Sequence, residues 1–144
     1  MMDFDQFKEK AFAAALAEGC DAAELYFLEE NSFSATVLEQ ELDAYSVSQT
    51  RGLNLRVQLA GKNGYPMQGK CEYRALPARE CRIFDASERE KIELAMALER
   101  AAKAQDPRIA RVMRSIVGSS NTRTRICNTL GLDAMREERV AYAF

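Results

Sequence analysis

The sequence contains no histidine and no tryptophan among its 144 residues. Without histidine, the chain cannot form a Ser-His-Asp triad, a Cys-His nucleophile pair, a histidine-containing zinc site or an imidazole general base. Most hydrolytic mechanisms are therefore excluded for this sequence by itself.

Long hydrophobic runs are also missing. The most apolar stretch, residues 11–17, is far shorter than the ~20 residues that a membrane-spanning helix needs. The first residues are acidic and do not have the basic-then-apolar order of a secretory signal. With 47% hydrophobic and 29% charged residues, the composition is typical of a globular domain. We therefore expect a cytoplasmic protein without membrane association.

The four cysteines, Cys20, Cys71, Cys81 and Cys127, form no Cys-x-x-Cys pair and match no zinc-ribbon spacing. Disulfides are rare in cytosolic proteins, and free cysteine usually behaves as a small buried apolar residue. The sequence therefore predicts four unconnected thiols, no metal site and no cofactor in this chain.

Two amphipathic helices are predicted from their capping signals. Asp3 is a candidate N-cap for the first helix, which ends at Gly19. Ser87 and Glu90 have the spacing of a capping box for the second helix, which ends at Asp106-Pro107. The apolar positions expected to face the core in the second helix are Ile92, Leu94, Ala95, Leu98, Ala101 and Ala102.

After each helix the hydrophobic period shortens to that of strands. Predicted strands in the first half cover residues 24–28, 33–39, 42–48 and 53–59, with a turn at Asn31-Ser32. A hairpin turn is predicted at residues 61–64, because Asn63-Gly64 is a strong hairpin signal. In the second half they cover residues 109–117, 122–129 and 139–144, with a polar turn at residues 118–121. The strict alternation from Leu53 to Leu59 is typical of a half-buried antiparallel strand.

The predicted fold class is α+β. Two helix-then-antiparallel-meander units would share a mostly antiparallel sheet, with the helices packed on one face. We expect the first unit in residues 1–65, a connector in residues 66–84 and the second unit in residues 85–144.

Charge is distributed unevenly between the two halves. Residues 1–50 carry 11 acidic and 2 basic side chains, a net charge of −9, whereas residues 51–144 carry 18 basic and 11 acidic, a net charge of +7. Such asymmetry is typical of nucleic-acid binding or of two halves that attract each other within one fold. The second interpretation is favoured because no aromatic residue is interleaved for base stacking. The densest basic stretch contains Arg108, Arg111, Arg114, Arg123 and Arg125.

Three stretches carry specific motifs: residues 21–26, residues 51–57 with residues 61–65, and residues 106–109 with residues 128–132. These motifs resemble the N-terminal region of the TldD/PmbA family, described as modulators of DNA gyrase. Residues 21–26 (Asp-Ala-Ala-Glu-Leu-Tyr) are similar to the strand that follows the family's first helix. Residues 51–57 (Arg-Gly-Leu-Asn-Leu-Arg-Val) with residues 61–65 (Gly-Lys-Asn-Gly-Tyr) resemble its most specific strand and hairpin. Residues 106–109 and 128–132 are similar to its Asp-x-Arg-Ile and Asn-Ser/Thr-x-Gly elements. The resemblance extends over nearly the whole chain.

The resemblance implies a role in a cytoplasmic, zinc-dependent peptidase that matures peptides and degrades antitoxins. Family members form dimers. The His-Glu-x-x-x-His zinc motif of the TldD-type chains, which their PmbA-type partners do not have, lies in a C-terminal domain beyond the matched region. The chain ends at Phe144, where the family would continue into that domain, and it is short after Tyr65. No zinc ligand is carried over to this sequence, because it has no histidine.

Few residues are candidates for a functional role. Arg51 could bind a substrate carboxylate, although a surface ion pair is the favoured interpretation. Asn128, a second weak candidate for substrate binding, and Gly131 fit a bend at a strand end. Gly52 and Gly64 suit positions where the backbone turns or is approached closely. No catalytic residue is predicted.

The leading hypothesis is a non-catalytic N-terminal module of a TldD/PmbA-type metallopeptidase. It would contribute to a substrate passage and to subunit contacts in a homo- or heterodimer, with a peptide or an unfolded protein as its other partner. An exposed sheet edge could accept such a peptide as an added strand. The alternatives are a self-standing interaction or oligomerisation domain and, less favoured, a nucleic-acid-binding domain.

Overall fold

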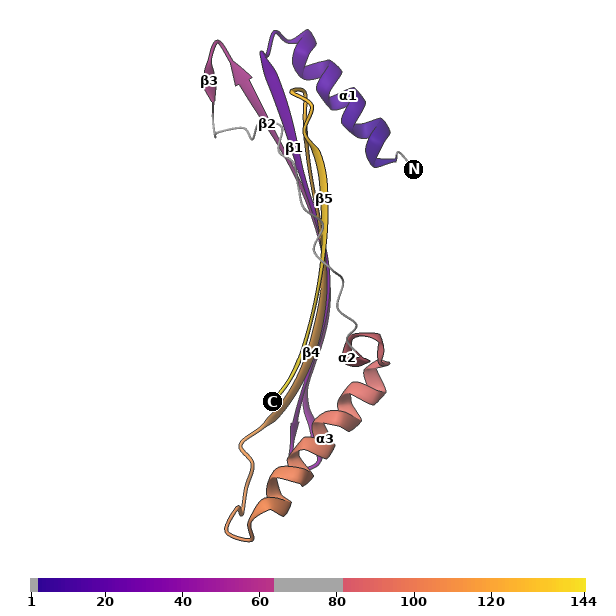
Figure 1. Cartoon of the computed structure of the whole chain (residues 1–144), viewed down its shortest axis with the longest axis vertical. Helices are drawn as coiled ribbons and strands as arrows, with labels where there is room; N and C mark the ends of the chain where they lie inside the picture. Colours follow the sequence, from indigo (N-terminus) through magenta and orange to yellow (C-terminus); the bar gives the residue numbers. More distant parts are fainter. Residues whose placement is uncertain (1–2, 64–81) are drawn as a thin grey trace. The chain divides into compact units, whose positions relative to one another are not determined.

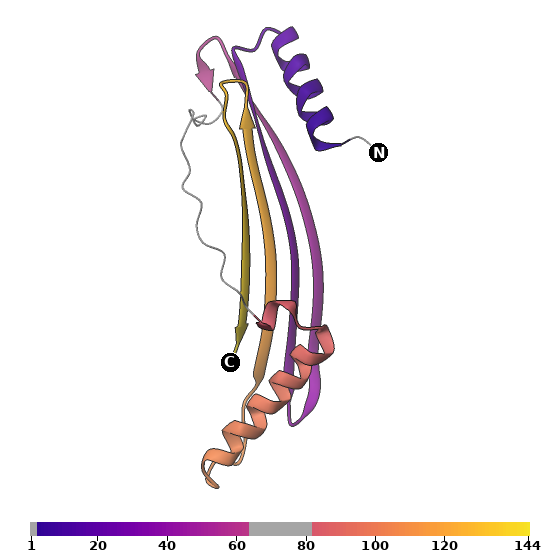
Figure 2. The same ribbon diagram turned by 45° about the vertical axis from the view of Figure 1, so that its right-hand side comes forward.

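The computed structural model of the chain describes residues 3–63 and 82–144. It has an α+β fold in which five strands form one sheet of order β3-β2-β1-β4-β5 (Figures 1 and 2). The predicted fold class is therefore confirmed. None of the described helices is both long enough and apolar enough to cross a bilayer. The elements are α1 (Phe4–Ala17), β1 (Ala22–Leu38), β2 (Glu41–Leu59), β3 (Lys62–Asn63), α2 (Arg82–Asp85), α3 (Glu88–Gln105), β4 (Ser115–Asn128) and β5 (Asp133–Ala143).

The chain is divided into two compact units, each with parts of both sequence halves. The described residues of unit 1 are 3–29, 51–63 and 123–136, and those of unit 2 are 30–50, 82–122 and 137–144. The predicted succession of units, residues 1–65 and then 85–144, differs from this arrangement. The reason is that each of the four long strands contributes one end to unit 1 and the other to unit 2. Residues 66–81 of the predicted connector lie outside the described residues.

The predicted turns at Asn31-Ser32 and at residues 118–121 are wrong, because β1 and β4 continue through them. In β1, Phe33, Ala35 and Val37 are buried, whereas the serine and threonine residues between them are only half-buried. The polar residues Ser34 and Thr36 therefore occupy the opposite face of the sheet and do not interrupt the strand. The predicted strand at residues 109–117 begins only at Ser115.

Gly118 is needed in β4 for space rather than for a turn. A Cβ atom at this position would meet the ring of Tyr142 from β5. The Tyr142 ring therefore packs over the glycine, as aromatic side chains often do across neighbouring strands.

Two-residue turns join β2 to its sequence neighbours. Glu39 and Gln40 both have positive φ angles, 52° and 62°, as do Ala60 and Gly61, 52° and 70°. Positive φ at both positions is typical of type I′ hairpins. The second hairpin pairs Leu59 with Lys62, so its turn lies at Ala60-Gly61. The predicted turn at residues 61–64 is therefore displaced, because Lys62 and Asn63 form β3. Gly64 itself is outside the described residues.

Both predicted helix starts are confirmed. The side chain of Asp3 accepts a 2.7 Å hydrogen bond from the Phe4 amide, and Gly19 follows the end of α1 with a φ of +83°. Ser87 and Glu90 form the reciprocal bonds of a capping box at α3. Capping of this kind satisfies backbone donors that have no partner within the helix.

The core of unit 2 lies between α3 and one face of the sheet. The cluster consists of Phe33, Ala35, Val37, Ala95 and Val117. The fully buried positions of α3 are Lys91, Ala95 and Glu99, one turn apart. The predicted apolar stripe is confirmed for Ala95 and for Ile92 and Leu94, which are half-buried and pack against the cluster, whereas Ala101 is exposed.

Glu99 is buried because polar groups of the β1–β2 hairpin reach it. Its Oε2 accepts bonds from the amide of Gln40 at 2.9 Å and from Gln40 Nε2 at 3.1 Å. Lys103 lies 2.7 Å from Oε1. These donors stabilise the ionised carboxylate and so lower the pKa of Glu99, and the contact with Lys103 makes the largest contribution.

Unit 1 has its own small core. Its fully buried apolar residues come from the end of α1, the start of β1 and the β4–β5 turn region: Ala15, Ala22, Ala23, Leu25, Cys127 and Leu132. α1 covers part of one face of the sheet in this unit, and the part that it leaves uncovered forms the candidate site.

Candidate functional site

An open groove of about 310 Å³ lies in unit 1 between α1 and the strands β1 and β2. Its lining is mainly aromatic and aliphatic, with charged side chains from both strands. The lining residues are Asp3, Phe4, Phe7, Phe27, Glu29, Arg51 and Leu53.

Aromatic contacts fix the position of the α1 end of this groove. The rings of Phe4 and Phe27 lie 5.3 Å apart at 56°, a tilted arrangement that aromatic pairs favour. The guanidinium of Arg125 lies 4.8 Å from the centre of the Phe4 ring. Phe7 is 38% exposed, so an apolar surface stays available to a bound molecule.

Arg51, the predicted substrate-binding candidate, lies at this groove and forms an ion pair. Its Nε and a terminal nitrogen lie 2.8 and 2.7 Å from Glu29 Oε1. The side chain of Arg51 is 57% exposed, whereas that of Glu29 is only 17% exposed. The favoured interpretation of a surface ion pair therefore agrees with the geometry, and an incoming carboxylate would compete with Glu29.

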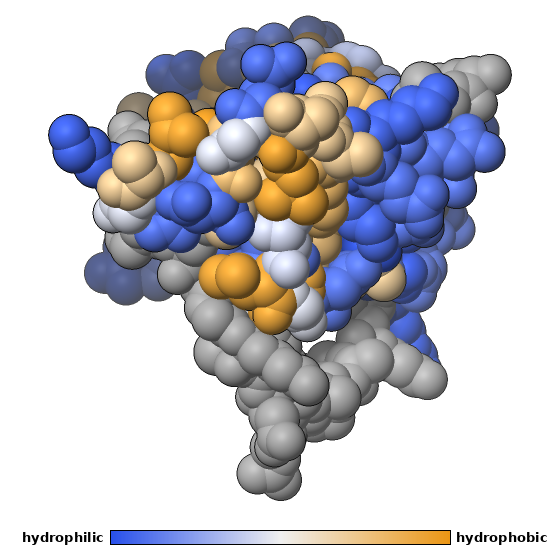
Figure 3. Space-filling view, turned by 90° about the horizontal axis from the view of Figure 1, so that it is seen from above, coloured by the Kyte–Doolittle hydropathy of each residue, from blue (hydrophilic) through white to orange (hydrophobic). Residues whose placement is uncertain are grey.

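β2 presents an apolar strip beside the groove. Leu53, Leu55, Val57 and Leu59 share one face of the strand because they alternate along it, and they are 39–55% exposed. Viewed from the α1 end of unit 1, hydrophobic side chains gather in a band with hydrophilic side chains on both sides (Figure 3). Scattered exposed leucines are common, but contiguous apolar patches mark interaction sites.

The outer edge of β2 is open along most of its length. β3 is the outer neighbour of β2 and pairs only with Gln58 and Leu59. In the described part of the chain, no strand pairs with the outer edge of β2 from Glu41 to Val57. Such an edge presents backbone donors and acceptors to which another chain can add a strand.

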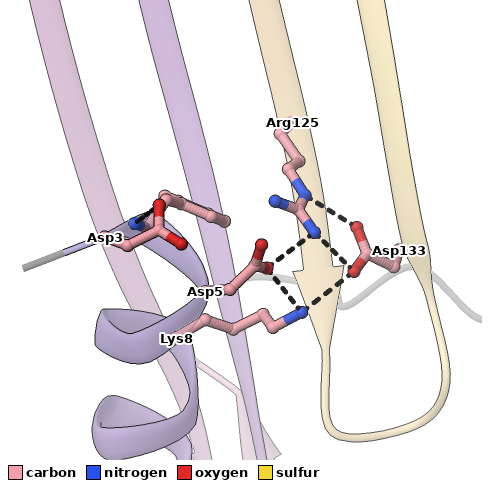
Figure 4. A network of polar contacts seen from close by, with 6 residues as sticks. Asp3, Asp5, Lys8, Arg125 and Asp133 are labelled. Carbon is pink, nitrogen blue, oxygen red and sulfur yellow. Dashed lines mark hydrogen bonds and ion pairs between the residues drawn. The ribbon is translucent and has the colours of Figure 1, made fainter.

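Four charged residues join α1 to β4 and β5 in unit 1 (Figure 4). Arg125 donates to both carboxylate oxygens of Asp133, at 2.8 and 2.9 Å, and to Asp5 at 2.9 Å. Lys8 lies 3.1 Å from both Asp5 and Asp133. The hydrogen bonds from Arg125 are the main reason that the pKa of Asp133 is lowered to about 2. The bonds to Asp133 and Asp5 raise the pKa of Lys8. No local pattern in the sequence indicates this network, because its members are up to 128 positions apart.

Acid should weaken unit 1 through Asp133. Because its folded pKa, about 2, is below the ordinary 3.8, its contribution to stability is complete above pH 4 and is lost as pH falls towards 2. Exposure of the pair limits the expected loss to about 1 kcal/mol. Urea titrations of the wild type and Asp133→Asn at pH 7 and pH 3 measure it. The difference between the two proteins should shrink at pH 3, and an unchanged difference would contradict the assignment.

Asn128, the other predicted candidate, organises the β4–β5 turn. Its Oδ1 accepts bonds from the amides of Leu130 and Leu132, both at 3.0 Å, and only 6% of the residue is exposed. Its backbone amide donates to the Leu132 carbonyl at 2.9 Å. These bonds hold the backbone in a bend at the end of β4, as the position of Asn128 in the sequence predicts.

Of the glycines singled out in the sequence, Gly131 has a backbone conformation that favours glycine, whereas Gly52 does not. Gly131, in the same turn as Asn128, has a φ of +97°, which favours glycine. Gly52 has neither a positive φ nor any atom within 4 Å of a Cβ placed on it, so the predicted close approach is wrong in the described structure.

The described cysteines are free thiols. Cys20 is half-buried and Cys127 is buried, and burial raises the pKa of the Cys127 thiol. Within residues 3–63 and 82–144, no group of three or more His, Cys, Asp or Glu side chains could hold a metal ion. Cys71 and Cys81 lie outside these ranges.

Most of the basic stretch is neutralised by acidic residues. Arg108 pairs with Asp106 in the same loop. The other pairs join distant segments of the chain: Arg111 with Glu39, Arg123 with Glu29, and Arg125 with Asp5 and Asp133. This arrangement favours attraction between the two oppositely charged halves over a surface for phosphate binding.

Comparison with known proteins gives a family match and a fold match. Residues 81–144 match the model described as the PmbA/TldA metallopeptidase central domain. The resemblance in sequence predicts an N-terminal domain over the whole chain, whereas this match assigns residues 81–144 to a central domain. A search of the curated proteins found no match.

Solved structures of three proteins share the fold over almost the whole chain. A proposed modulator of a DNA gyrase from Thermotoga maritima superimposes with a TM-score of 0.87, 24% identity and 98% coverage of this chain. TldE from Thermococcus kodakarensis gives 0.78, 17% and 94%, and a proposed modulator of DNA gyrase from Bacteroides thetaiotaomicron gives 0.65, 18% and 98%. The chain spans only 38–40% of the length of these proteins.

Proposed function

We propose that the chain belongs to the TldD/PmbA family, whose central-domain model matches residues 81–144, and that it is a non-catalytic module of a metallopeptidase of this type. It binds an extended peptide and contributes to subunit contacts, in a system for cytoplasmic peptide maturation or proteolysis. The sequence has no histidine, so a histidine-dependent zinc centre must be supplied by another part of such a system.

The open edge of β2 beside the apolar groove of unit 1 is the observation that carries this proposal. A peptide that adds a strand there makes main-chain hydrogen bonds, which give affinity with little demand on its sequence. Alternate side chains of the added strand would point to the same face as Leu53, Leu55 and Val57. A binding mode of this kind suits a peptidase module that must accept many unfolded sequences.

The groove gives the peptide a preference for apolar side chains at alternate positions. Phe7 and Leu53 are 38% and 46% exposed in the free chain, and their further burial contributes about 1 kcal/mol each. Arg51 and Glu29 neutralise each other at the groove, which disfavours a strong selection for peptide charge.

Binding of a fluorescent, unstructured peptide with alternating leucines tests the proposal. Leu55→Lys should weaken binding about tenfold, because it replaces an apolar contact with a solvated charge. Asn54→Lys is the matched control, since it adds the same charge on the opposite face of the same strand. Fluorescence anisotropy gives the dissociation constants.

Two results of the binding experiment would contradict the proposal. Equal weakening by both lysine variants would indicate a general charge effect, and no binding by the wild-type chain would remove the edge as a peptide site. The peptide should stay intact when it is incubated with the chain and zinc. Chelator-sensitive cleavage would show that the chemistry resides in this chain after all.

A further inference from the structure

A second cavity, of about 400 Å³, lies in unit 2 on the α3 side of the sheet. Its volume is within the range of small-molecule sites. Phe84 and Lys91 line it from the helical side, and Phe33, Gln49, Ser119 and Asn121 line it from the strands.

The Lys91 ammonium group is buried at this cavity among neutral partners. Only 7% of the residue is exposed. Its Nζ donates to Ser119 Oγ at 3.0 Å and to the Phe84 carbonyl at 3.1 Å, and it lies 5.3 and 5.9 Å from the ring centres of Phe33 and Phe84.

No carboxylate pairs with Lys91 in residues 3–63 and 82–144, although the other buried charge of α3, Glu99, has Lys103 beside it. Burial of a cation is unfavourable unless an anion compensates it. An ammonium group has three donors, and the two bonds to Phe84 and Ser119 leave one for a further acceptor. The cavity therefore offers a positive charge and a free donor to a small anion.

Asn121 places an unsatisfied acceptor in the same cavity. Its Oδ1 is buried and has no hydrogen-bond donor in the described structure. Ser119 and Asn121 are two residues apart in β4, so their side chains point to the same face, about 7 Å apart along the strand. A complementary molecule thus carries a negative group at Lys91 and Ser119 and an N–H donor at Asn121.

We propose that this cavity binds the C-terminal residue of a peptide through its α-carboxylate and its amide N–H. Lys91 and the hydroxyl proton of Ser119 donate to the carboxylate, and Asn121 Oδ1 accepts from the amide. Phe33 and Phe84 provide an apolar surface for the side chain. The inference rests on the proposed function in that its ligand is a peptide, and it adds recognition of the free C-terminus.

A phosphate group fits these residues less well. It carries more negative charge than one lysine compensates, and it offers no N–H donor to Asn121. An isolated carboxylate such as acetate satisfies Lys91 but leaves Asn121 Oδ1 without a donor. Lys91 and Asn121 together therefore favour a ligand with both a carboxylate and an amide N–H. An N-acylated amino acid has both groups, and it is the chemical unit at the C-terminus of every peptide.

Titration of the full chain with N-acetylphenylalanine and with its C-terminal amide tests the inference by calorimetry. The free acid should bind at least tenfold more tightly than the amide, and both acetate and inorganic phosphate should bind more weakly than the free acid. Lys91→Met should remove the preference for the acid. Lys10→Met, which changes an exposed lysine of α1, should leave it intact.

Equal affinity for the acid and the amide, or an unchanged preference in Lys91→Met, would overturn the inference, as would phosphate binding as tight as that of the acid. If Lys91→Met does not fold, Ser119→Ala provides the test through a several-fold loss of affinity for the acid. N-acetylphenylalanine is too short to add a strand to β2, so Leu55→Lys should not affect it. Failure of the β2 edge and failure of this cavity are therefore distinguishable.

Discussion

Asn128→Ala should lower the free energy of unfolding by about 3 kcal/mol. The substitution removes the oxygen that accepts from the amides of Leu130 and Leu132 at 3.0 Å each. Leu132 is only 3% exposed, so water cannot readily replace the lost acceptor at its amide. A buried donor without a partner costs about 1–3 kcal/mol, which makes this turn one of the most sensitive points of unit 1.

Urea denaturation monitored by circular dichroism measures this loss, with Asn54→Ala as the control. Asn54 is exposed on β2, and its replacement should change the free energy of unfolding by less than about 0.5 kcal/mol. Equal effects of the two substitutions would show that the side chain of Asn128 does not organise the turn.

Leu25→Ala should destabilise the chain by about 3 kcal/mol, whereas Leu55→Ala should cost less than 1 kcal/mol. Leu25 in β1 has no exposed surface, so truncation leaves a cavity in the core of unit 1. Leu55 in β2 is 46% exposed, and water can fill the space that its side chain leaves. The two substitutions are chemically identical and differ only in burial.

Thermal unfolding of both variants, combined with the peptide-binding assay, separates stability from function. Leu25→Ala should lower the melting temperature strongly and leave peptide affinity unchanged below the transition. Leu55→Ala should do the reverse, with little change in melting temperature and several-fold weaker peptide binding. A large loss of stability in Leu55→Ala would show that the apolar strip belongs to a core rather than to an interaction surface.

Neighbouring residues in the sequence were enough to predict only part of the surroundings of the candidate site. Arg51 was correctly placed as a surface ion-pair residue, but its partner, Glu29, became visible only in the structure. The alternation from Leu53 to Leu59 predicted an apolar face covered by the helices, but these apolar residues are 39–55% exposed, and the half-buried positions are Arg56 and Gln58 between them. The aromatic groove beside it was missed, because its lining comes from three segments that no spacing in the sequence relates.

Lys91 and Asn121 illustrate the same limit for the second cavity. A lysine in the first turn of a helix is ordinarily solvated, and nothing in its neighbours along the chain indicates burial. The predicted turn at residues 118–121 even placed Asn121 outside a strand. Its position beside Lys91 depends on the continuation of β4 through Gly118, which the Tyr142 ring covers.

The sequence by itself determined the starts of α1 and α3, the α+β class, the absence of histidine chemistry and the resemblance to the TldD/PmbA family. Capping depends on residues three positions apart, and composition needs no structure at all, so both can be read from the chain. Only the tertiary structure decided that four long strands serve two units, that Lys91 and Glu99 are buried, and that the outer edge of β2 is open among the described residues. These features depend on which face of each strand and helix another segment covers, and that information is distributed over the whole fold.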